Sequence, residues 1–343
     1  MNILENISLR SYNTFGIDVT ARYFASFASE EELASLYNTK QVIQSNDRLI
    51  LGGGSNILFT CNVDGCVLHN EIPGIELLEE NENSVLLRVG AGVNWHSFVQ
   101  YCVDHNWSGV ENLSLIPGCV GASPMQNIGA YGVEVKEVIE VVEAWDIEAR
   151  KVVYFSNADC EFGYRDSVFK HALKGKFVIL NVVFRLSKTP HFKIEYGAII
   201  QELEKMGTTS LSIKAVSEAV IRIRTSKLPN PSVIGNAGSF FKNPSVSASQ
   251  YHKLKNAFSD IVSYTNADGT YKLAAGWLIE QCGWKGYRKG DAGCHERQAL
   301  VLVNYGKASG KEIIQLSESI ATSVKSHFGI ELEREVNMYP QVL

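Results

Sequence analysis

The sequence predicts an α+β protein built from several units, and three observations point to this fold class. At 343 residues the chain is long enough for two or three domains. Helix signals and strand-like segments both occur along its length, and strands dominate the middle. Two prolines within three residues, Pro229 and Pro231, mark a plausible boundary before the last unit.

Composition narrows the class of protein. The chain is 45% hydrophobic and 20% charged with a net charge of −5, which is ordinary for a globular protein and argues against a nucleic-acid or membrane-surface partner. Its seven cysteines include no C-x-x-C pair and are interpreted as reduced thiols. The histidines show no metal-ligand spacing, so no metal is expected. Without a signal-peptide pattern or an apolar run of ~18 residues, we expect a cytoplasmic protein.

The first unit, of about seventy residues, is predicted to be a small α/β unit. Ser29 with Glu32 forms a capping-box pattern, which predicts the start of a short helix. Strand-like segments follow at Arg48–Leu51, Ile57–Phe59 and Gly65–His69.

The middle unit is predicted to be a sheet covered by a few helices. Helices are expected near Trp95–His105 and Val216–Thr225. The predicted strands are Ile75–Leu78, Val85–Val89, Val138–Trp145, Val152–Phe155 and Phe177–Leu186.

The last unit contains a predicted helix near Leu273–Cys282 and a predicted strand at Ala299–Val303. Ser309 and Glu312 form a second capping box before a helix that Gly329 should end. The apolar face of that helix consists of Ile313, Leu316, Ile320, Val324 and Phe328. Ile330–Val336 then alternates apolar and charged residues, which predicts a final strand.

Two glycine-rich turns, Leu51–Asn56 and Ile116–Pro124, each follow an apolar segment. Glycines let consecutive amides point into one concavity, which can bind an anion. The first turn is no dinucleotide fingerprint, because Ile57 stands at the third glycine position and no P-loop lysine follows. One such turn alone would be read as a plain tight turn. Two of them, the second continuing to Gly132, favour a long diphosphate-bearing ligand held by the backbone.

Further segments complete a specific pattern that runs nearly end to end. They are NTFGID at 13–18, LGGGSN at 51–56, IPGCVGASPMQNIGAYG at 116–132, FGYRDS at 162–167, RTSKLPNP at 224–231, GNAGSFFKNP at 235–244, LAAGWLIEQCG at 273–283 and LEREV at 332–336. In their order and chemistry the sequence resembles the UDP-N-acetylenolpyruvoylglucosamine reductases, also called UDP-N-acetylmuramate dehydrogenases, of type I.

The resemblance implies a fold and a cofactor. The fold is the FAD-binding fold of the vanillyl-alcohol-oxidase (PCMH-type) superfamily in two α+β domains, 1–72 with 333–343 and 73–228, plus an α+β substrate-binding domain, 229–332. NADPH is expected to reduce a non-covalent FAD, and hydride then passes to the enolpyruvyl group of UDP-N-acetylglucosamine enolpyruvate. The implied cofactor-binding residues are Gly52, Gly53, Gly54, Ser55, Asn56, Pro117, Gly118, Gly121, Ser123, Gly129 and Gly238.

Two implied catalytic residues act on the charge that develops beside the substrate carboxylate. Arg165 would hold that carboxylate, since a planar guanidinium fork matches it better than an ammonium does. Without the family motif, Arg165 would be interpreted as a surface residue that pairs with Asp166. Glu335 would stabilise the enol form, whereas Glu331 and Glu333 on the same predicted strand face are interpreted as solvated carboxylates.

The third implied catalytic residue, Ser239, would protonate the substrate carbanion. A hydroxyl is a poor acid and needs a cation beside it, and either Lys227 or Lys242 could supply the charge. The alternative is a structural serine in a turn, whose hydroxyl is hydrogen-bonded to backbone groups. A serine hydrolase is disfavoured, because Phe241 replaces the second glycine of a G-x-S-x-G elbow.

The resemblance also implies donors for the substrate nucleotide, although each would otherwise read as an ordinary exposed polar residue. They are Tyr131, Tyr196, Lys227, Asn243, Lys285 and Gln298. The C-terminal tail departs from the family pattern, with Arg334 where proline is common and Asn337–Tyr339 in place of an arginine-containing tail. The pose of the last strand is therefore open.

Two rival functions remain at this point. An FAD-dependent sugar or alcohol oxidase of the same fold would share the glycine turns and would not need the Ser239 segment. A nucleotide-sugar-binding protein without catalysis would not need Arg165, Ser239 and Glu335 together. The expected partners are small molecules only, and the chain is expected to be a monomer.

Overall fold

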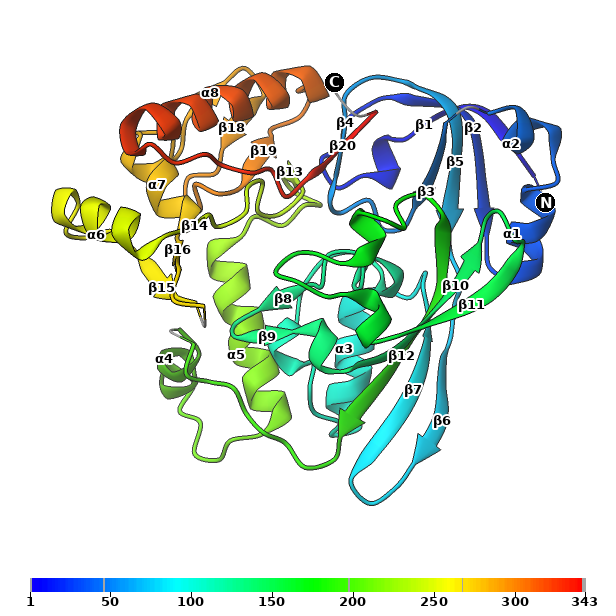
Figure 1. Ribbon diagram of the computed structural model, residues 1–343, viewed down its shortest axis with the longest axis horizontal. Coiled ribbons are helices and arrows are strands. Elements are labelled where there is room, and N and C mark those ends of the chain that lie inside the picture. Colours follow the sequence, from blue (N-terminus) through cyan, green and yellow to red (C-terminus); the bar gives the residue numbers. More distant parts are fainter. Residues whose placement is uncertain (1, 46, 197, 267, 341–343) are drawn as a thin grey trace. The chain divides into compact units, whose positions relative to one another are not determined.

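The computed structural model describes residues 2–45, 47–196, 198–266 and 268–340 (Figure 1). Its chain divides into two compact units, and both contain helices and strands, which confirms the α+β class. Unit 1 comprises Met1–Ile7, Ala21–Gly53 and Val63–Ser226. Unit 2 comprises Ser8–Thr20, Gly54–Asn62 and Lys227–Leu343.

A four-stranded sheet in the order β1-β2-β5-β3 opens unit 1, and β5 pairs in parallel with both β2 and β3. Two short helices pack on it through Leu33, Leu36 and Val42. Ser29 caps the first helix by accepting the Glu32 N–H at 3.2 Å, as predicted. The elements are β1 (Leu4–Ser8), β2 (Thr20–Phe27), α1 (Glu30–Leu36), α2 (Lys40–Gln44), β3 (Arg48–Leu51) and β5 (Val63–Asn70).

An antiparallel five-stranded sheet in the order β11-β10-β12-β7-β6 forms the larger part of unit 1 (Figure 1). Helix α3 packs on it through Trp95 and Phe98, and the Phe98 ring lies 4.7 Å from that of Phe184. The strand and helix predictions for this region are confirmed within a few residues: β6 (Ile75–Glu80), β7 (Ser84–Gly90), α3 (Trp95–Asp104), β10 (Ile139–Asp146), β11 (Lys151–Ser156) and β12 (Phe177–Ser187).

Two helices complete unit 1, and both pack into one small apolar cluster that contains Ile199, Leu203, Val220 and Ile223. They are α4 (Ala198–Lys205) and α5 (Ile213–Lys227), of which α5 was predicted. The shorter elements of this unit are η2 (Glu111–Leu113), η3 (Val120–Ala122), β8 (Gly129–Ala130), β9 (Val133–Glu134), η4 (Val135–Glu137), η5 (Ala158–Cys160) and η6 (Val168–Lys170).

Unit 2 contains sheets in the orders β13-β19-β18-β17 and β14-β16-β15, together with the parallel pair β4-β20. Its longest helix begins at the predicted capping box, where the Ser309 N–H donates to the Glu312 carboxylate at 2.7 Å, and ends at the left-handed Gly329. The elements are η1 (Arg10–Tyr12), β4 (Ile57–Phe59), β13 (Gly235–Asn236), β14 (Ser245–Val246), α6 (Ala248–Ala257), β15 (Ser263–Thr265), β16 (Tyr271–Leu273), α7 (Ala275–Gln281), β17 (Arg288–Lys289), β18 (Ala292–Cys294), β19 (Leu302–Asn304), α8 (Gly310–Phe328) and β20 (Asn337–Tyr339).

Two strand predictions in unit 2 are corrected. The strand expected at Ala299–Val303 is β19, which begins only at Leu302 because a turn, closed by the Val301 N–H on the Gln298 carbonyl at 3.0 Å, precedes it. Ile330 and Val336 are buried and Leu332 between them is half-buried, but the segment forms only the isolated bridge between Phe241 and Arg334. The regular strand is β20, because only there does the chain meet β4 and form a ladder.

Segments 8–20 and 54–62 group with the C-terminal part of the chain. The Thr14 hydroxyl donates to the Asn236 carbonyl at 2.6 Å, and the Asn304 side chain donates to the Phe15 carbonyl at 2.9 Å. The expected division into three domains remains a prediction. Residues 341–343 of its first domain lie outside the described residues.

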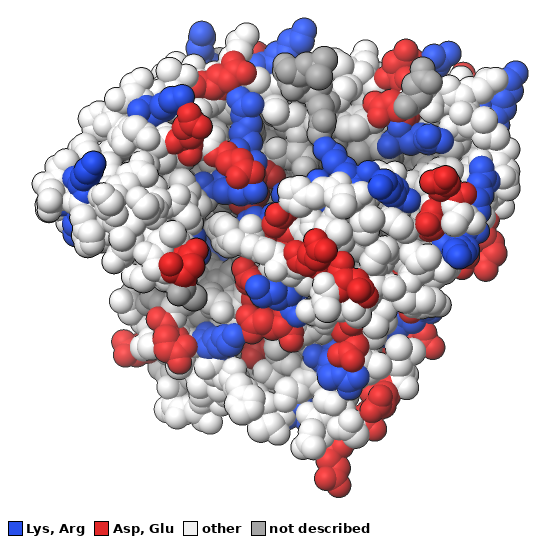
Figure 2. Space-filling view, viewed as in Figure 1, with Lys and Arg blue, Asp and Glu red and all other residues white. Residues whose placement is uncertain are grey.

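The surface carries mixed charge. On the face seen in Figure 2, acidic and basic side chains are interspersed. All seven cysteines are free, as predicted. Among the described residues, the helices are all too short or too polar to cross a lipid bilayer.

Candidate active site

The two glycine-rich turns meet inside unit 1. A Cβ atom built on Gly53 would lie 3.0 Å from the Cα atom of Gly118, and one built on Gly52 would lie 3.7 Å from the Cβ atom of Cys119. The two turns can approach this closely because neither Gly53 nor Gly118 carries a side chain. Backbone groups of both turns are thus available together to one ligand.

The second turn fits a cofactor held by backbone and one hydroxyl. A Cβ atom on Gly121 would lie 2.5 Å from that of Ala91, so this position has no room for a side chain. Ser123 is 1% exposed, and its hydroxyl has no hydrogen-bond partner among the described residues. A buried unsatisfied hydroxyl is costly unless a ligand or water completes it. The predicted FAD is such a ligand, and these residues fit it.

The rest of the first turn belongs to unit 2. Gly54 has a left-handed φ of 59°, and a Cβ atom there would lie 2.0 Å from the Tyr12 carbonyl oxygen. The Thr14 N–H holds the Gly54 carbonyl at 3.0 Å. Asn56 reaches the C-terminal segment, since its side chain donates to the Glu335 carbonyl at 3.3 Å. Ser55 lies between Gly54 and Asn56.

Arg165 lies in unit 1 on a left-handed residue, with φ of 54°. Its guanidinium donates to the Gly129 carbonyl at 2.6 Å, and its Nη1 atom would lie 3.0 Å from a Cβ atom on Gly129. The guanidinium also lies over the Tyr164 ring, 5.3 Å from the centroid. Non-glycine residues with positive φ are uncommon and concentrate at functional sites.

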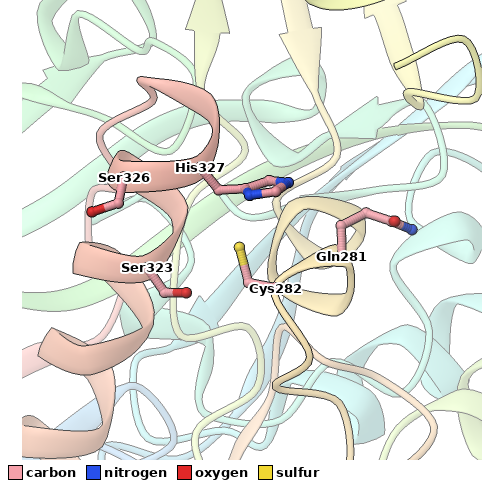
Figure 3. A pocket seen from close by; sticks show the side chains of 5 residues that line it. All are labelled: Gln281, Cys282, Ser323, Ser326 and His327. Atoms are coloured by element: carbon pink, nitrogen blue, oxygen red, sulfur yellow. The ribbon is translucent and has the colours of Figure 1, made fainter. Parts of the chain in front are cut away.

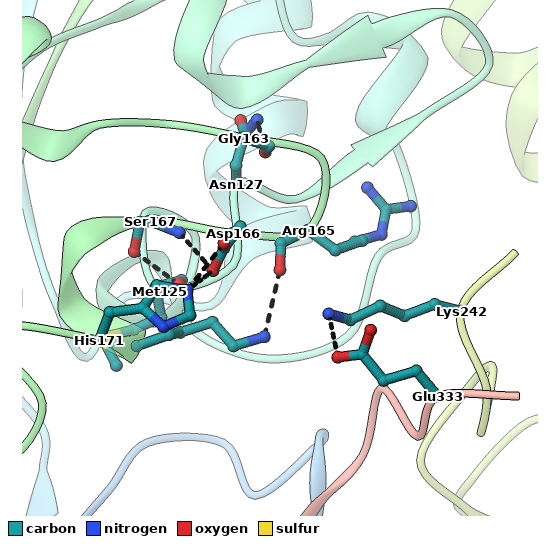
Figure 4. Close-up of polar contacts among 10 residues, drawn as sticks. Met125, Asn127, Gly163, Arg165, Asp166, Ser167, His171, Lys242 and Glu333 are labelled. Carbon is teal, nitrogen blue, oxygen red and sulfur yellow. Dashed lines mark hydrogen bonds and ion pairs between the residues drawn. The ribbon is translucent and has the colours of Figure 1, made fainter. Parts of the chain in front are cut away.

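Asp166 makes its hydrogen bonds elsewhere. Its carboxylate lies 2.8 Å from His171 and accepts the Ser167 N–H at 3.0 Å. Figure 4 shows the Arg165 side chain extending away from Asp166. The Asp166 pKa is lowered by its bond to His171 and the charges of His171 and Lys170, which outweigh the larger opposing effect of burial.

Tyr131 and Tyr196 lie together in unit 1, with ring centroids 6.4 Å apart in an edge-to-face arrangement. Tyr131 is left-handed, with φ of 50°, and burial raises the pKa of its hydroxyl. The positive charge of Arg224 opposes this effect and acts to lower the same pKa. Arg224 was not among the predicted site residues, although the RTSKLPNP segment contains it.

In unit 2 the structure brings Ser239 and Glu335 into neighbouring segments. The Glu335 N–H donates to the carbonyl of Phe240 at 2.9 Å, and Phe241 bridges Arg334. Both Ser239 and Glu335 are half-buried, while Phe240 is buried completely. Gly238, directly before Ser239, is left-handed, and a Cβ atom there would meet no heavy atom within 4 Å.

The neighbouring carboxylates of this segment form ion pairs at the surface. Lys242 donates to Glu333 at 2.5 Å (Figure 4), and Lys325 donates to Glu331 at 2.6 Å. Glu331 and Glu333 are both exposed, which agrees with their interpretation as solvated residues.

The other predicted substrate-binding residues are all in unit 2. Asn243 accepts the Ala275 N–H at 2.9 Å and so orders the start of α7. Lys285 is paired with Glu280 at 2.7 Å, and Gln298 accepts the Leu300 N–H at 3.4 Å. Lys227 is the last residue of α5, where unit 2 resumes, and it is exposed.

An open cavity of about 380 Å³ lies elsewhere in unit 2, on α7 and α8 (Figure 3). Its lining consists of Gln281, Cys282, Ser323, Ser326 and His327. It contains none of the predicted site residues. Within the described parts of the chain, no three His, Cys, Asp or Glu residues gather as a metal would require.

Comparison with protein families identifies two regions of the chain. Residues 230–339 match the C-terminal domain of UDP-N-acetylenolpyruvoylglucosamine reductase. Residues 21–150 match an FAD-binding domain, as the glycine turns in this region would require.

Full-length relatives agree with these matches. The chain is 52% identical to the UDP-N-acetylenolpyruvoylglucosamine reductase of Amoebophilus asiaticus over 98% of its own length and 99% of the relative's. It is 47% identical to that of Pseudomonas putida over 98% of both chains. The crystal structure of the Thermus caldophilus enzyme superposes with a TM-score of 0.70 at 23% identity, covering 99% of this chain and all of the other, so the fold is shared.

Proposed function

The chain belongs to the UDP-N-acetylenolpyruvoylglucosamine reductase family, and from this premise we propose how its residues act. The protein uses NADPH to reduce the enolpyruvyl group of UDP-N-acetylglucosamine enolpyruvate, which yields UDP-N-acetylmuramate for peptidoglycan precursor synthesis. The geometric observation that carries the assignment of roles is the backbone contact between Phe240 and Glu335, since it places a hydroxyl and a carboxylate in adjacent segments of unit 2.

FAD, when bound, supplies the hydride chemistry of the reaction. We assign its binding in unit 1 to the backbone of the touching turns at Gly53 and Gly118 and to the buried hydroxyl of Ser123. This assignment is supported by the close approach of the turns and by the unsatisfied state of that hydroxyl.

Ser239 delivers the proton to the carbon beside the substrate carboxylate. Its hydroxyl must become an alkoxide as it does so, and a neighbouring cation lowers the free energy of that state. Of the two candidate lysines, Lys242 already forms an ion pair with Glu333. The side chain of Lys227 makes no hydrogen bond or ion pair with the described residues, so we assign the supporting charge to Lys227.

Arg165 and Glu335 act on the substrate carboxylate. Arg165 has one guanidinium nitrogen committed to the Gly129 carbonyl, which orients the group, and a guanidinium fork matches a planar carboxylate. Glu335 stabilises the enol form of that carboxylate. Tyr131, Tyr196, Asn243, Lys285 and Gln298 are assigned to the substrate nucleotide.

The remaining assignments concern the cellular location, the oligomeric state and the binding partners. We propose a cytoplasmic monomer that binds small molecules and neither nucleic acid nor membrane. The net charge of −5 and the free cysteines support this setting.

The visible spectrum of the purified protein tests the function. We expect a yellow protein whose FAD is released by acid, whose colour NADPH bleaches without oxygen, and whose colour returns when the enolpyruvyl substrate is added. A colourless protein would support a binding protein without catalysis. Colour that returns only with oxygen would support an oxidase of the same fold, and colour retained by the acid precipitate would exclude non-covalent FAD.

A further inference from the structure

The segment before the second glycine turn is held between helices α3 and α5 of unit 1. From α3, the Trp95 indole N–H donates to the Leu113 carbonyl at 2.9 Å. From α5, the Ser217 hydroxyl lies 2.8 Å from that of Ser114, and both side chains are buried. The chain therefore reaches Leu115 with its path already fixed on two sides.

Leu115 adopts a left-handed conformation, with φ of 58°, although it is neither glycine nor asparagine. Such a residue persists only where its surroundings determine it. Here the His96 Nδ1 atom accepts the Leu115 N–H at 3.0 Å, and the Arg224 Nε–H donates to the Leu115 carbonyl at 3.2 Å. The peptide groups on both sides of the strained Cα atom are thus each held by one side chain.

Arg224 also holds the far end of the same segment. Its guanidinium interacts electrostatically with the hydroxyl of Tyr131, another left-handed residue of this stretch. The Asn112 side chain donates to the Tyr131 carbonyl at 3.0 Å and so fixes its backbone. Arg224 thus bonds residue 115 directly and acts electrostatically on residue 131, and all predicted cofactor contacts of the second turn lie between them.

We propose that Arg224 and His96 are positioning residues that hold the segment 115–131 in the conformation that binds the cofactor and presents Tyr131. The proposal rests on the proposed function, because that function supplies the ligand, FAD. Arg224 is the larger contributor, since it bonds Leu115 and its charge also acts on Tyr131, whereas His96 acts on Leu115 alone. Arg222 lies two residues away on α5 and is exposed, and its side chain makes no hydrogen bond or ion pair with the described residues. It is therefore a matched control.

The test measures the dissociation constant of FAD from the apoprotein by flavin fluorescence. Arg224→Leu should weaken FAD binding roughly tenfold or more, as expected when a hydrogen-bonded charged group is removed. His96→Ala should weaken it less, and His96→Asn should restore most of the affinity, because the Asn oxygen can accept the Leu115 N–H where Nδ1 does. Arg222→Leu should bind FAD like the unaltered protein.

The control variants separate positioning from general damage to the fold. Arg224→Lys keeps the cation and loses the Nε donor, so it should retain the thermal melting of the apoprotein and still bind FAD more weakly. The proposal is overturned if Arg224→Leu and Arg224→Lys bind FAD normally, or if His96→Asn is as weak as His96→Ala. If the unaltered protein binds no FAD, the proposed function fails instead, so the two failures are distinguishable.

Discussion

The two units hold their predicted site residues by different means. In unit 1, Leu115, Tyr131 and Arg165 are left-handed although none of them is glycine, and each is fixed by hydrogen bonds to its side chain or backbone. In unit 2 the corresponding left-handed residues are Gly54 and Gly238, which need no such support. There the Ser239 and Glu335 segments are aligned by backbone hydrogen bonds instead.

This difference separates two kinds of role. Strained non-glycine residues held by buried partners suit a surface that must be shaped before its ligand arrives. Backbone hydrogen bonds between extended segments also position side chains, but these bonds form whichever side-chain types the segments carry. Substitutions in unit 1 should therefore alter binding geometry, whereas substitutions of Ser239 or Glu335 should alter chemistry and leave binding nearly intact.

Ser239→Ala should have the largest effect on turnover. Reduction of FAD by NADPH needs no proton from Ser239, so that half-reaction should keep its rate. Reoxidation by the enolpyruvyl substrate should slow by ~10²–10⁴-fold, as for loss of a general acid. Rapid mixing with each substrate in turn, followed through the flavin absorbance, measures the two rates separately.

Two controls sharpen the Ser239 experiment. Ser239→Cys should regain part of the lost rate, because a thiol is a stronger acid than a hydroxyl. Substrate affinity of Ser239→Ala should be almost unchanged. If both half-reactions slowed equally, Ser239 would be a structural turn residue and another group would deliver the proton.

Arg165→Lys should have the next largest effect, and it tests the unit 1 side of the comparison. The ammonium keeps the charge but cannot both bond the Gly129 carbonyl and present a planar fork to a carboxylate. We expect turnover to fall by roughly tenfold or more, as for loss of a charged hydrogen bond. The nucleotide should still bind, because other residues are assigned to it. Steady-state kinetics alongside calorimetric binding of the substrate would measure both, and unchanged turnover would remove Arg165 from catalysis.

Local patterns predicted most of the elements, and motifs predicted the candidate site. The Ser309 capping box and the apolar stripe of α8 are local features, so their helix could be predicted from sequence alone. The final strand was predicted in the wrong place, which shows that a local pattern does not determine strand pairing. Ile330–Val336 has the alternation of a strand, but a regular ladder depends on a neighbouring strand, and only Asn337–Tyr339 forms one.

The contacts of Arg224 could not be predicted for a similar reason. Arg224 belongs to the RTSKLPNP segment at 224–231, yet Leu115 and Tyr131, on which it acts, are about one hundred residues away in the chain. Nothing local marks Leu115 as left-handed either, because leucine has no preference for that conformation. Roles that depend on such distant contacts become visible only in the folded chain.

The smallest predicted effect is the loss of folding stability at acid pH. One buried histidine of each unit contributes to it. Burial and the nearby Arg224 charge lower the pKa of His96 in unit 1. Burial and the Arg297 charge likewise lower the pKa of His295 in unit 2, although Glu296 opposes them. The unfolded chain therefore binds protons at these sites more readily than the folded chain does below pH ~6.5. Their contribution to stability is complete above that pH and is lost as the pH falls through the lowered folded pKa values.

We therefore expect the free energy of unfolding to decrease from pH 7 towards pH 5, and His96→Asn to reduce the slope. One site can change that slope by at most about 1.4 kcal/mol per pH unit, since it exchanges no more than one proton. His295→Asn provides the same test in unit 2. Urea denaturation at several pH values measures both slopes. If His96 serves the positioning role, His96→Asn should reduce the dependence of the unfolding free energy on pH while most of the FAD affinity at pH 8 is kept. His295→Asn should also reduce that dependence, and it should leave the FAD affinity unchanged at every pH. An unchanged slope in His96→Asn would show that His96 remains able to protonate in the folded chain, and its bond to the Leu115 N–H would then be too weak to hold the turn.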